Sequence, residues 1–247
     1  MPFTTDSSVG IDILISSVSS ILFPLSLSLL LPVFLYLIVL EKEEKLIQMM
    51  RMNGMKMRDY WLVNFIFSFI LSAITNIVFC MFGYFVLQSN LFLNIGWDVL
   101  TVVLLGWILA QIGLSTFLQV FLASSQAANI IGYLFSIWTN LIGATLSIAI
   151  FQYPSHQPFF VSLFPTFAFN RIFYLMFTDC SSDHCYTSLS MIPDEVKFCI
   201  YVLYGSFVFF QLLGMYLYEV VPQEFGTTQP LGFPFKFITD KCKKEQP

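Results

Sequence analysis

The sequence predicts an all-α polytopic membrane protein, and three observations support that prediction. Of the 247 residues, 57% are hydrophobic and 11% are charged, against about 45–50% and about 25% in ordinary soluble domains. Residues 61–97 and 99–170 contain no Lys, Arg, Asp or Glu, and each run is longer than the roughly 20 apolar residues that cross a bilayer. The net charge of −4 also argues against a nucleic-acid partner, which needs a basic surface.

Five apolar segments are each long enough to span a membrane with some tilt. They cover residues 18–40, 61–87, 97–122, 127–151 and 196–221. The first contains Pro24 and Pro32, so we expect a kinked helix whose freed carbonyl groups are satisfied by neighbouring helices. The connections after the second and third segments are short, so the helices on either side of each should be antiparallel neighbours.

The cations predict the orientation of these spans. Five follow the first span and four lie in the tail: Lys42, Lys45, Arg51, Lys56 and Arg58, then Lys236, Lys241, Lys243 and Lys244. The positive-inside rule places both groups in the cytoplasm, so an odd number of crossings must separate the amino terminus from the tail. Five spans therefore predict an exofacial segment 1–17, a transmembrane domain 18–222 and a cytoplasmic tail 223–247.

A further apolar stretch, residues 159–177, would make the number of spans even. It also contains Pro165 and Arg171. We therefore expect this stretch to dip into the outer leaflet and return, or to lie along it, with Arg171 snorkelling to the headgroups. The predicted fold is five transmembrane helices, an exofacial re-entrant element and a cytoplasmic helix within residues 41–58.

Cys180 and Cys185 lie close together in a polar loop. They are either a disulfide or two free thiols, and the predicted exofacial position favours the disulfide. His184 lies beside them, but two thiols and one imidazole are fewer than the four ligands of a structural zinc site. We expect no metal site.

The polar residues inside the spans are uncharged. They are Asn64, Asn76, Gln111, Gln119, Asn129, Asn140 and Gln211. Their simplest role is interhelical hydrogen bonding, beside the small residues Gly83, Gly106, Gly113, Gly132 and Gly143. The alternative is that a few of them line a weakly polar groove suited to an amphiphile such as a lipid.

No catalytic constellation is recognisable in the sequence. Gly113 and Ser115 form a Gly-x-Ser pair, but His156 and His184 lie in the predicted exofacial region, out of reach of a serine at membrane depth. No phosphate-binding loop occurs either. We expect a protein that is not an enzyme and binds no cofactor of its own.

Among the polar stretches, residues 41–58 have the most regular sequence pattern. Glu41 and Lys45 form an i,i+4 pair that favours a helix, and Gly54 is suited to end it in a left-handed conformation. Five methionines follow: Met49, Met50, Met52, Met55 and Met57. The helix is either an amphipathic segment on anionic headgroups or an adaptable docking surface for a cytosolic partner.

This loop resembles the A subfamily of ATP-binding cassette (ABC) transporters. EKEEKL followed by MMRMNGMKMRDYW is similar to that family's E-K-E/Q-x-K-L helix, methionine-rich segment and Tyr-Trp pair. Three further stretches agree in order and spacing. They are residues 122–146, with an IGY segment, residues 162–176, SLFPTFAFNRIFYLM, and residues 215–235, MYLYEVVPQEFGTTQPLGFPF.

The resemblance implies roles for the matching residues. The loop would be a coupling helix on the ATPase domain, through Glu41, Lys42, Lys45, Met49, Met50, Met52 and Gly54. Pro165, Phe167, Phe169 and Arg171 would flank an exofacial gate, and Glu219, Pro222, Glu224 and Gly226 would form the hinge to the ATPase. The substrate would be lipid-like, with ATP and Mg²⁺ on a partner.

The resemblance also implies parts that this sequence does not show. Family members begin with another helix and usually a large exofacial domain, and they continue into a nucleotide-binding domain. We therefore expect the membrane core of one transporter half, working with a nucleotide-binding domain or second half in trans. The alternative is a non-transporting membrane scaffold or a truncated, inactive relic.

Overall fold

The computed structural model describes residues 18–87, 90–151, 157–181 and 185–220, and all regular structure in these ranges is helical. A helix begins at residue 18 and leads into α2 (Leu30–Glu43), followed by α3 (Leu46–Met52), α4 (Met57–Phe82), α5 (Asn90–Asn94), α6 (Trp97–Leu118), α7 (Ser125–Thr145), α8 (Phe159–Ser162), α9 (Pro165–Ser181) and α10 (Asp194–Val220). Two π turns, η1 (Gly83–Leu87) and η3 (Leu146–Ile150), and two 3₁₀ turns, η2 (Gln119–Phe121) and η4 (Leu189–Met191), complete the described structure.

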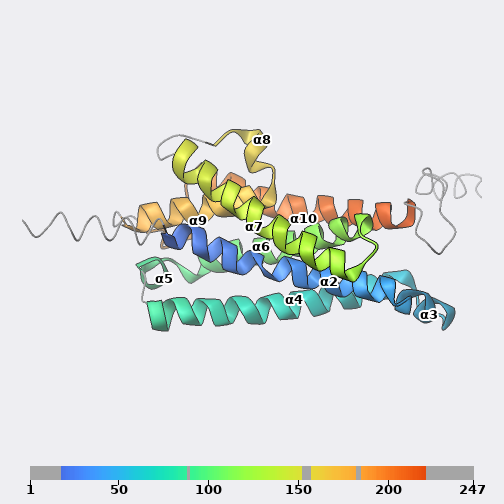
Figure 1. The fold of residues 1–247 in the computed structure, drawn as a ribbon. Helices are drawn as coiled ribbons and strands as arrows, with labels where there is room; N and C mark the ends of the chain where they lie inside the picture. Colours follow the sequence, from blue (N-terminus) through green and yellow to red (C-terminus); the bar gives the residue numbers. More distant parts are fainter. Residues whose placement is uncertain (1–17, 88–89, 152–156, 182–184, 221–247) are drawn as a thin grey trace, which may run out of the picture.

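Five helical stretches are long and apolar enough to cross a membrane. They are Val18–Glu43, Met57–Phe85, Trp97–Phe121, Ser125–Ile150 and Asp194–Tyr218, and they confirm the five predicted spans. The stretches run side by side in one bundle, with α3 at one end and α5 at the other (Figure 1). These two ends are called the α3 end and the α5 end below. The last turns of α10 lie at the α3 end (Figure 1).

Helix α6 is the centre of the bundle. It packs against α10, α2, α4 and α9, and its sequence is mostly apolar on every side, as expected of a helix that is largely buried. Trp107 of α6 stacks on Phe169 of α9, with ring centroids 4.1 Å apart and planes 3° apart. This stacked pair lies in the largest apolar core of the protein.

Helices α4 and α7 have the opposite distribution of polar residues to a soluble helix. On α4, Ile66, Ile70 and Ile74 are exposed, whereas Ser68 and Ser72 are buried. On α7, Ile130, Leu134 and Trp138 are likewise exposed, and the buried residues are small or polar. Apolar side chains outside and polar ones inside satisfy a helix surrounded by lipid, so the chain is an integral, multi-pass membrane protein.

The first span is broken at Leu29, as its prolines predict. Pro32 lies in the first turn of α2, where a missing N–H is tolerated, and Leu29 forms the turn that precedes it. The Gln111 side chain of α6 donates from Nε2 to the carbonyl of Leu27, at 2.8 Å. A neighbouring helix therefore satisfies a carbonyl group beside the break.

Three of the seven uncharged polar residues, Gln111, Asn140 and Gln211, join helices, which confirms the simpler predicted role for those three. Thr116 of α6 donates to Gln211 of α10 at 3.0 Å, and Asn170 of α9 donates to Asn140 of α7 at 3.1 Å. The glycines predicted to pack are in close contact with other segments. The nearest neighbours of a Cβ added at Gly83, Gly106, Gly113, Gly132 and Gly143 would be Phe92, Tyr204, Phe207, Pro32 and Asn170.

The stretch predicted as re-entrant forms two helices, the short α8 and the longer α9. Helix α9 extends to Ser181, four residues beyond the predicted limit, and packs against α7, α10 and α5. Ala168, Phe169, Ile172, Phe173 and Met176 are all fully buried. Its aromatic side chains therefore fill the core of the bundle instead of facing lipid.

Gly214 provides a test of the α6–α10 contact. A Cβ at this position would lie 2.7 Å from the backbone oxygen of Thr116, whereas a Cβ at Gly205, on the exposed side of α10, has nothing within 4 Å. Gly214→Ala should destabilise the protein by about 1–3 kcal/mol, the usual cost of overpacking. Gly205→Ala is the matched control and should not. Thermal unfolding in detergent measures both, and equal midpoints would contradict the close packing.

Candidate functional site

The loop between α2 and α4 forms two turns around a short helix. Helix α2 ends at Glu43, Lys45 has a left-handed backbone with φ of 56°, and α3 then runs from Leu46 to Met52. Gly54 has φ of 88°, which confirms its predicted role as a helix stop. The helix expected to run from Glu41 to its stop at Gly54 is instead interrupted, because the left-handed backbone at Lys45 breaks the i,i+4 relation of Glu41 and Lys45.

Helix α3 lies on the end of the bundle with one side buried. Ile47 packs against Tyr60 and Trp61 at the start of α4, and Met215 and Tyr218 of α10 join the same cluster. Trp61 meets Tyr218 edge-to-face, with centroids 5.3 Å apart. We call this group the α3 cluster: Ile47, Met50, Met55, Met57, Tyr60, Trp61, Met215 and Tyr218.

The other side of α3 is exposed and apolar. Leu46, Met49 and Met52 are exposed, and their i, i+3, i+6 spacing places them along one side of the helix. The five methionines therefore divide into two groups. Met49 and Met52 are exposed, whereas Met50, Met55 and Met57 pack against the α3 cluster's aromatic residues.

Three charged residues at the end of α2 connect this loop to other spans through hydrogen bonds. Glu41 accepts a hydrogen bond from the Tyr60 hydroxyl at 2.7 Å. Lys42 donates to the carbonyl of Leu122 at 3.1 Å, in the turn between α6 and α7. Glu43 accepts from the backbone N–H of Ser125 at 2.7 Å, where a carboxylate favourably meets the positive end of the α7 dipole.

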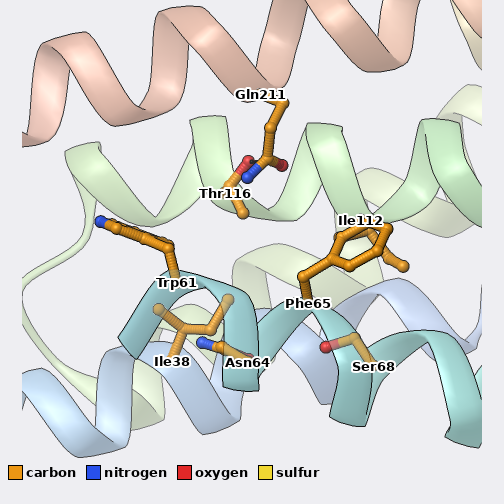
Figure 2. Close-up of a pocket in the computed structure, with 8 residues that line it drawn as sticks. All are labelled: Ile38, Trp61, Asn64, Phe65, Ser68, Ile112, Thr116 and Gln211. Atoms are coloured by element: carbon orange, nitrogen blue, oxygen red, sulfur yellow. Dashed lines mark hydrogen bonds between the residues drawn. The ribbon is translucent and has the colours of Figure 1, made fainter. Parts of the chain in front are cut away.

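A narrow recess lies beside the α3 cluster (Figure 2). Trp61, Asn64, Phe65 and Ser68 of α4 line one side, and the lining from other helices is Ile38 of α2, Ile112 and Thr116 of α6, and Gln211 of α10. In this conformation it is too tight to admit a water molecule. Because Trp61 belongs to both the α3 cluster and the recess, the two features share a wall.

At the α5 end, Arg171 is buried rather than snorkelling. It is 0% exposed, and its Nε lies 2.8 Å from the carboxylate of Glu195 in the first turn of α10. Its Nη1 donates to the carbonyl of Phe151, just beyond η3, and its guanidinium lies over the ring of Tyr174. The predicted position is wrong because the bundle itself supplies a carboxylate and a carbonyl that replace the headgroups.

The other residues predicted to flank the exofacial gate make packing contacts within the bundle. Pro165 begins α9, a position that suits proline because the first helical N–H has no intrahelical partner. Phe167 packs on Phe164, and Phe169 is buried against Trp107. Cys180 and Cys185 are joined by a disulfide.

The predicted hinge lies at the limit of the described structure. Glu219 lies in the last turn of α10, and Pro222, Glu224 and Gly226 lie outside the described residues. Within the part of the chain that the structure describes, no group of three or more His, Cys, Asp or Glu side chains could hold a metal ion.

Comparison with known proteins gives a consistent result. No protein-family model matches the chain. It is 32% identical to ABC transporter A family member 9 of Dictyostelium discoideum over 213 residues, which are 85% of this chain and 25% of the relative. It is 31% identical to member 7 of the same organism over 219 residues, 88% of this chain and 25% of the relative.

A plant member of the same family is also similar to this chain. ABC transporter A family member 8 of Arabidopsis thaliana is 26% identical over 166 residues, 64% of this chain and 18% of the relative. The chain is homologous to the ABC transporter A family. It spans about a quarter of the length of the Dictyostelium relatives that it matches, and its five apolar helices fit a membrane-domain part of such a transporter.

Two contacts of this A-family homologue were not predicted from the sequence. The first is the Arg171–Glu195 pair, for which a lone cation in an apolar stretch and an acid at the start of the next span were an available signal. The second is the α3 cluster, which joins α3 to α10 through Met215 and Tyr218. Nothing in the spacing of residues 41–61 indicates a contact with residues more than 150 positions away.

The buried Arg171–Glu195 pair can be compared with the exposed Lys197–Asp194 pair, which lies on α10 together with Glu195. Arg171→Met should destabilise the protein by about 3 kcal/mol, because Glu195 would lose its counter-charge in a largely dry site. Lys197→Met removes the exposed pair with Asp194 and should cost at most about 1 kcal/mol. Unfolding in detergent measures the difference, and adding Glu195→Gln to Arg171→Met should restore part of the loss. Equal effects of the two single variants would contradict the buried pair.

Proposed function

We propose that this chain is the membrane-spanning part of an A-family ABC transporter that moves a lipid or other amphiphile. ATP and Mg²⁺ would be bound by a nucleotide-binding domain or second transporter half supplied by another chain. In this proposal the α3 end is cytoplasmic, which places the cation-rich loop inside, and the α5 end with its disulfide is exofacial.

The exposed side of α3 is the observation that carries the proposal. Leu46, Met49 and Met52 form an apolar surface at the end of the bundle, beyond the apolar helices that cross the membrane. Such a surface is suited to a protein partner. The opposite side of α3 is fixed to α4 and α10 by the α3 cluster, so movement of a docked partner would reach two spans directly.

The uncharged interior supports an amphiphilic substrate. Residues 61–97 and 99–170 carry no charged side chain, and the buried Arg171 is paired with Glu195. An ion or proton pathway usually requires charged groups inside the membrane. Neutral amide and hydroxyl groups suit a molecule that has a polar head and an apolar body.

The gate and hinge roles follow from the same proposal. Arg171 and Glu195 hold α9 to α10 at the proposed exofacial end, where Pro165, Phe167 and Phe169 would flank the gate. Glu219, Pro222, Glu224 and Gly226 would connect α10 to the ATPase.

Charge substitutions on α3 test the coupling role. The double variant Met49→Asp, Met52→Asp should abolish capture of a phosphate-loop ATPase by the tagged full chain after crosslinking in native membranes, because two carboxylates cannot be buried in an apolar contact. Ala123→Asp, in the exposed turn between α6 and α7, adds charge away from α3 and is the control. Capture and membrane abundance are both measured by quantitative mass spectrometry.

Three outcomes would overturn the proposal. One is the absence of any phosphate-loop ATPase with the unmodified chain, another is undiminished capture by the double variant, and the third is equal loss with Ala123→Asp. Met50 is unsuitable for this test because it packs against the α3 cluster, so Met50→Asp would also destabilise the fold.

A further inference from the structure

A column of polar residues runs along the buried side of α4. Asn64, Ser68, Ser72 and Asn76 recur at every fourth position, which places them one above another on the helix. At 1.5 Å per residue the column is about 18 Å long, more than half of the roughly 30 Å of bilayer hydrocarbon. The column is hidden from lipid, because the exposed residues of α4 beyond Asp59 are apolar: Leu62, Val63, Ile66, Phe67, Ile70, Ile74, Ile77, Val78, Met81 and Phe82.

Part of this column lacks hydrogen-bond partners. Ser72 is 0% exposed and Asn76 is 7% exposed, yet among the described residues Ser72 Oγ and Asn76 Oδ1 have no hydrogen-bond partner. The Asn76 amide nitrogen donates only within α4, to the carbonyl of Ser72. Buried polar groups are normally satisfied by protein, water or a ligand, so the column indicates a partner that the described protein does not supply.

Gln111 and Gln211, two other buried polar residues of the spans, differ from this column. Gln111 bonds to the carbonyl of Leu27 on the first helix, and Gln211 bonds to Thr116 on α6. Those residues join helices, whereas the side-chain hydrogen bond of Asn76 remains within α4. The column is therefore not explained as an attachment of α4 to its neighbours.

The recess is continuous with the column at the α3 end. Asn64 and Ser68 belong to both, and Thr116 and Gln211 face them across the recess (Figure 2). The span that contains α4 is also the least buried. Only 17% of its apolar 18-residue stretch is buried inside the bundle, compared with 78% for the span that contains α6. Segments with few buried contacts separate at the lowest free-energy cost, so α4 is the side on which the recess can widen.

We propose that the α4 column and the recess, when α4 moves outward, open into a hydrated seam that binds the uncharged, hydroxyl- or amide-bearing headgroup of an amphiphile. The column offers neutral donors and acceptors, and residues 61–97 contain no cation to compensate an anionic phosphate, which is costly to bury without a counter-charge. This inference deepens the proposed function, because it locates the headgroup of the transported amphiphile and specifies its charge.

Cysteine labelling tests the seam in the full chain. Cys80→Ser, Cys199→Ala and Cys242→Ser leave the Cys180–Cys185 disulfide in place, and Ser72→Cys is compared with the lipid-facing control Ile74→Cys in phosphatidylcholine vesicles. Because only a hydrated thiol forms the reactive thiolate, a charged methanethiosulfonate should label Ser72→Cys about tenfold faster than Ile74→Cys. Ser68→Cys should behave like Ser72→Cys. Equally slow labelling at Ser72→Cys and Ile74→Cys would overturn the seam.

The headgroup is tested by repeating the labelling of Ser72→Cys with added lipid. Diacylglycerol, which has an uncharged hydroxyl head, should slow the reaction severalfold, and the same fraction of phosphatidic acid should not. Protection by neither lipid, or equally by both, would overturn the assignment of an uncharged headgroup. These measurements need no ATPase, so their failure is distinguishable from loss of partner capture in the α3 variants.

Discussion

Along the contact between α6 and α10, glycines on both helices bring the two backbones together. Gly113 of α6 lies against the backbone of Phe207, and Gly214 of α10 lies against the backbone of Thr116 and Phe117. Lipid offers no hydrophobic driving force for helix association, so close packing and interhelical hydrogen bonds must supply it. The Thr116–Gln211 hydrogen bond lies beside this close approach. Because α6 also packs against α2, α4 and α9, the positions of those helices depend on this contact.

The two ends of the bundle are fixed by different physical interactions. At the α5 end, one buried guanidinium joins the carbonyl beyond η3 to the first turn of α10, and α9, which carries it, is held between them. At the α3 end, aromatic and methionine side chains of the α3 cluster provide a softer apolar contact, since methionine adapts to several packing arrangements. The chemistry is therefore more specific at the α5 end and more adaptable where a partner is proposed to dock.

The spans were predictable from sequence because long uncharged runs have few alternatives to crossing a membrane. The left-handed backbone of Gly54 was predictable for a similar reason, since glycine tolerates a positive φ. The environment of Arg171 was not, because hydropathy shows that a cation is in an apolar segment and not which helix will face it. Lys45 was missed because a left-handed lysine contradicts local propensity, and only the contacts of Ile47 with α4 and α10 explain where α3 must lie. Predictions succeeded where a property is local and failed where it depends on which helices pack together.

Trp61 connects the two surfaces for which functions are proposed. Its indole packs against Tyr218 on the side of the α3 cluster and also forms a wall of the recess that leads to the polar column of α4. Interiors packed to high density transmit displacement instead of absorbing it. If α3 carries the movement of an ATPase, then a shift of α3 moves Ile47 against Trp61, and the indole can follow only by moving toward or away from the recess. Since α4 is the least buried of the spans, the expected response is displacement of α4, which would open the column to its ligand.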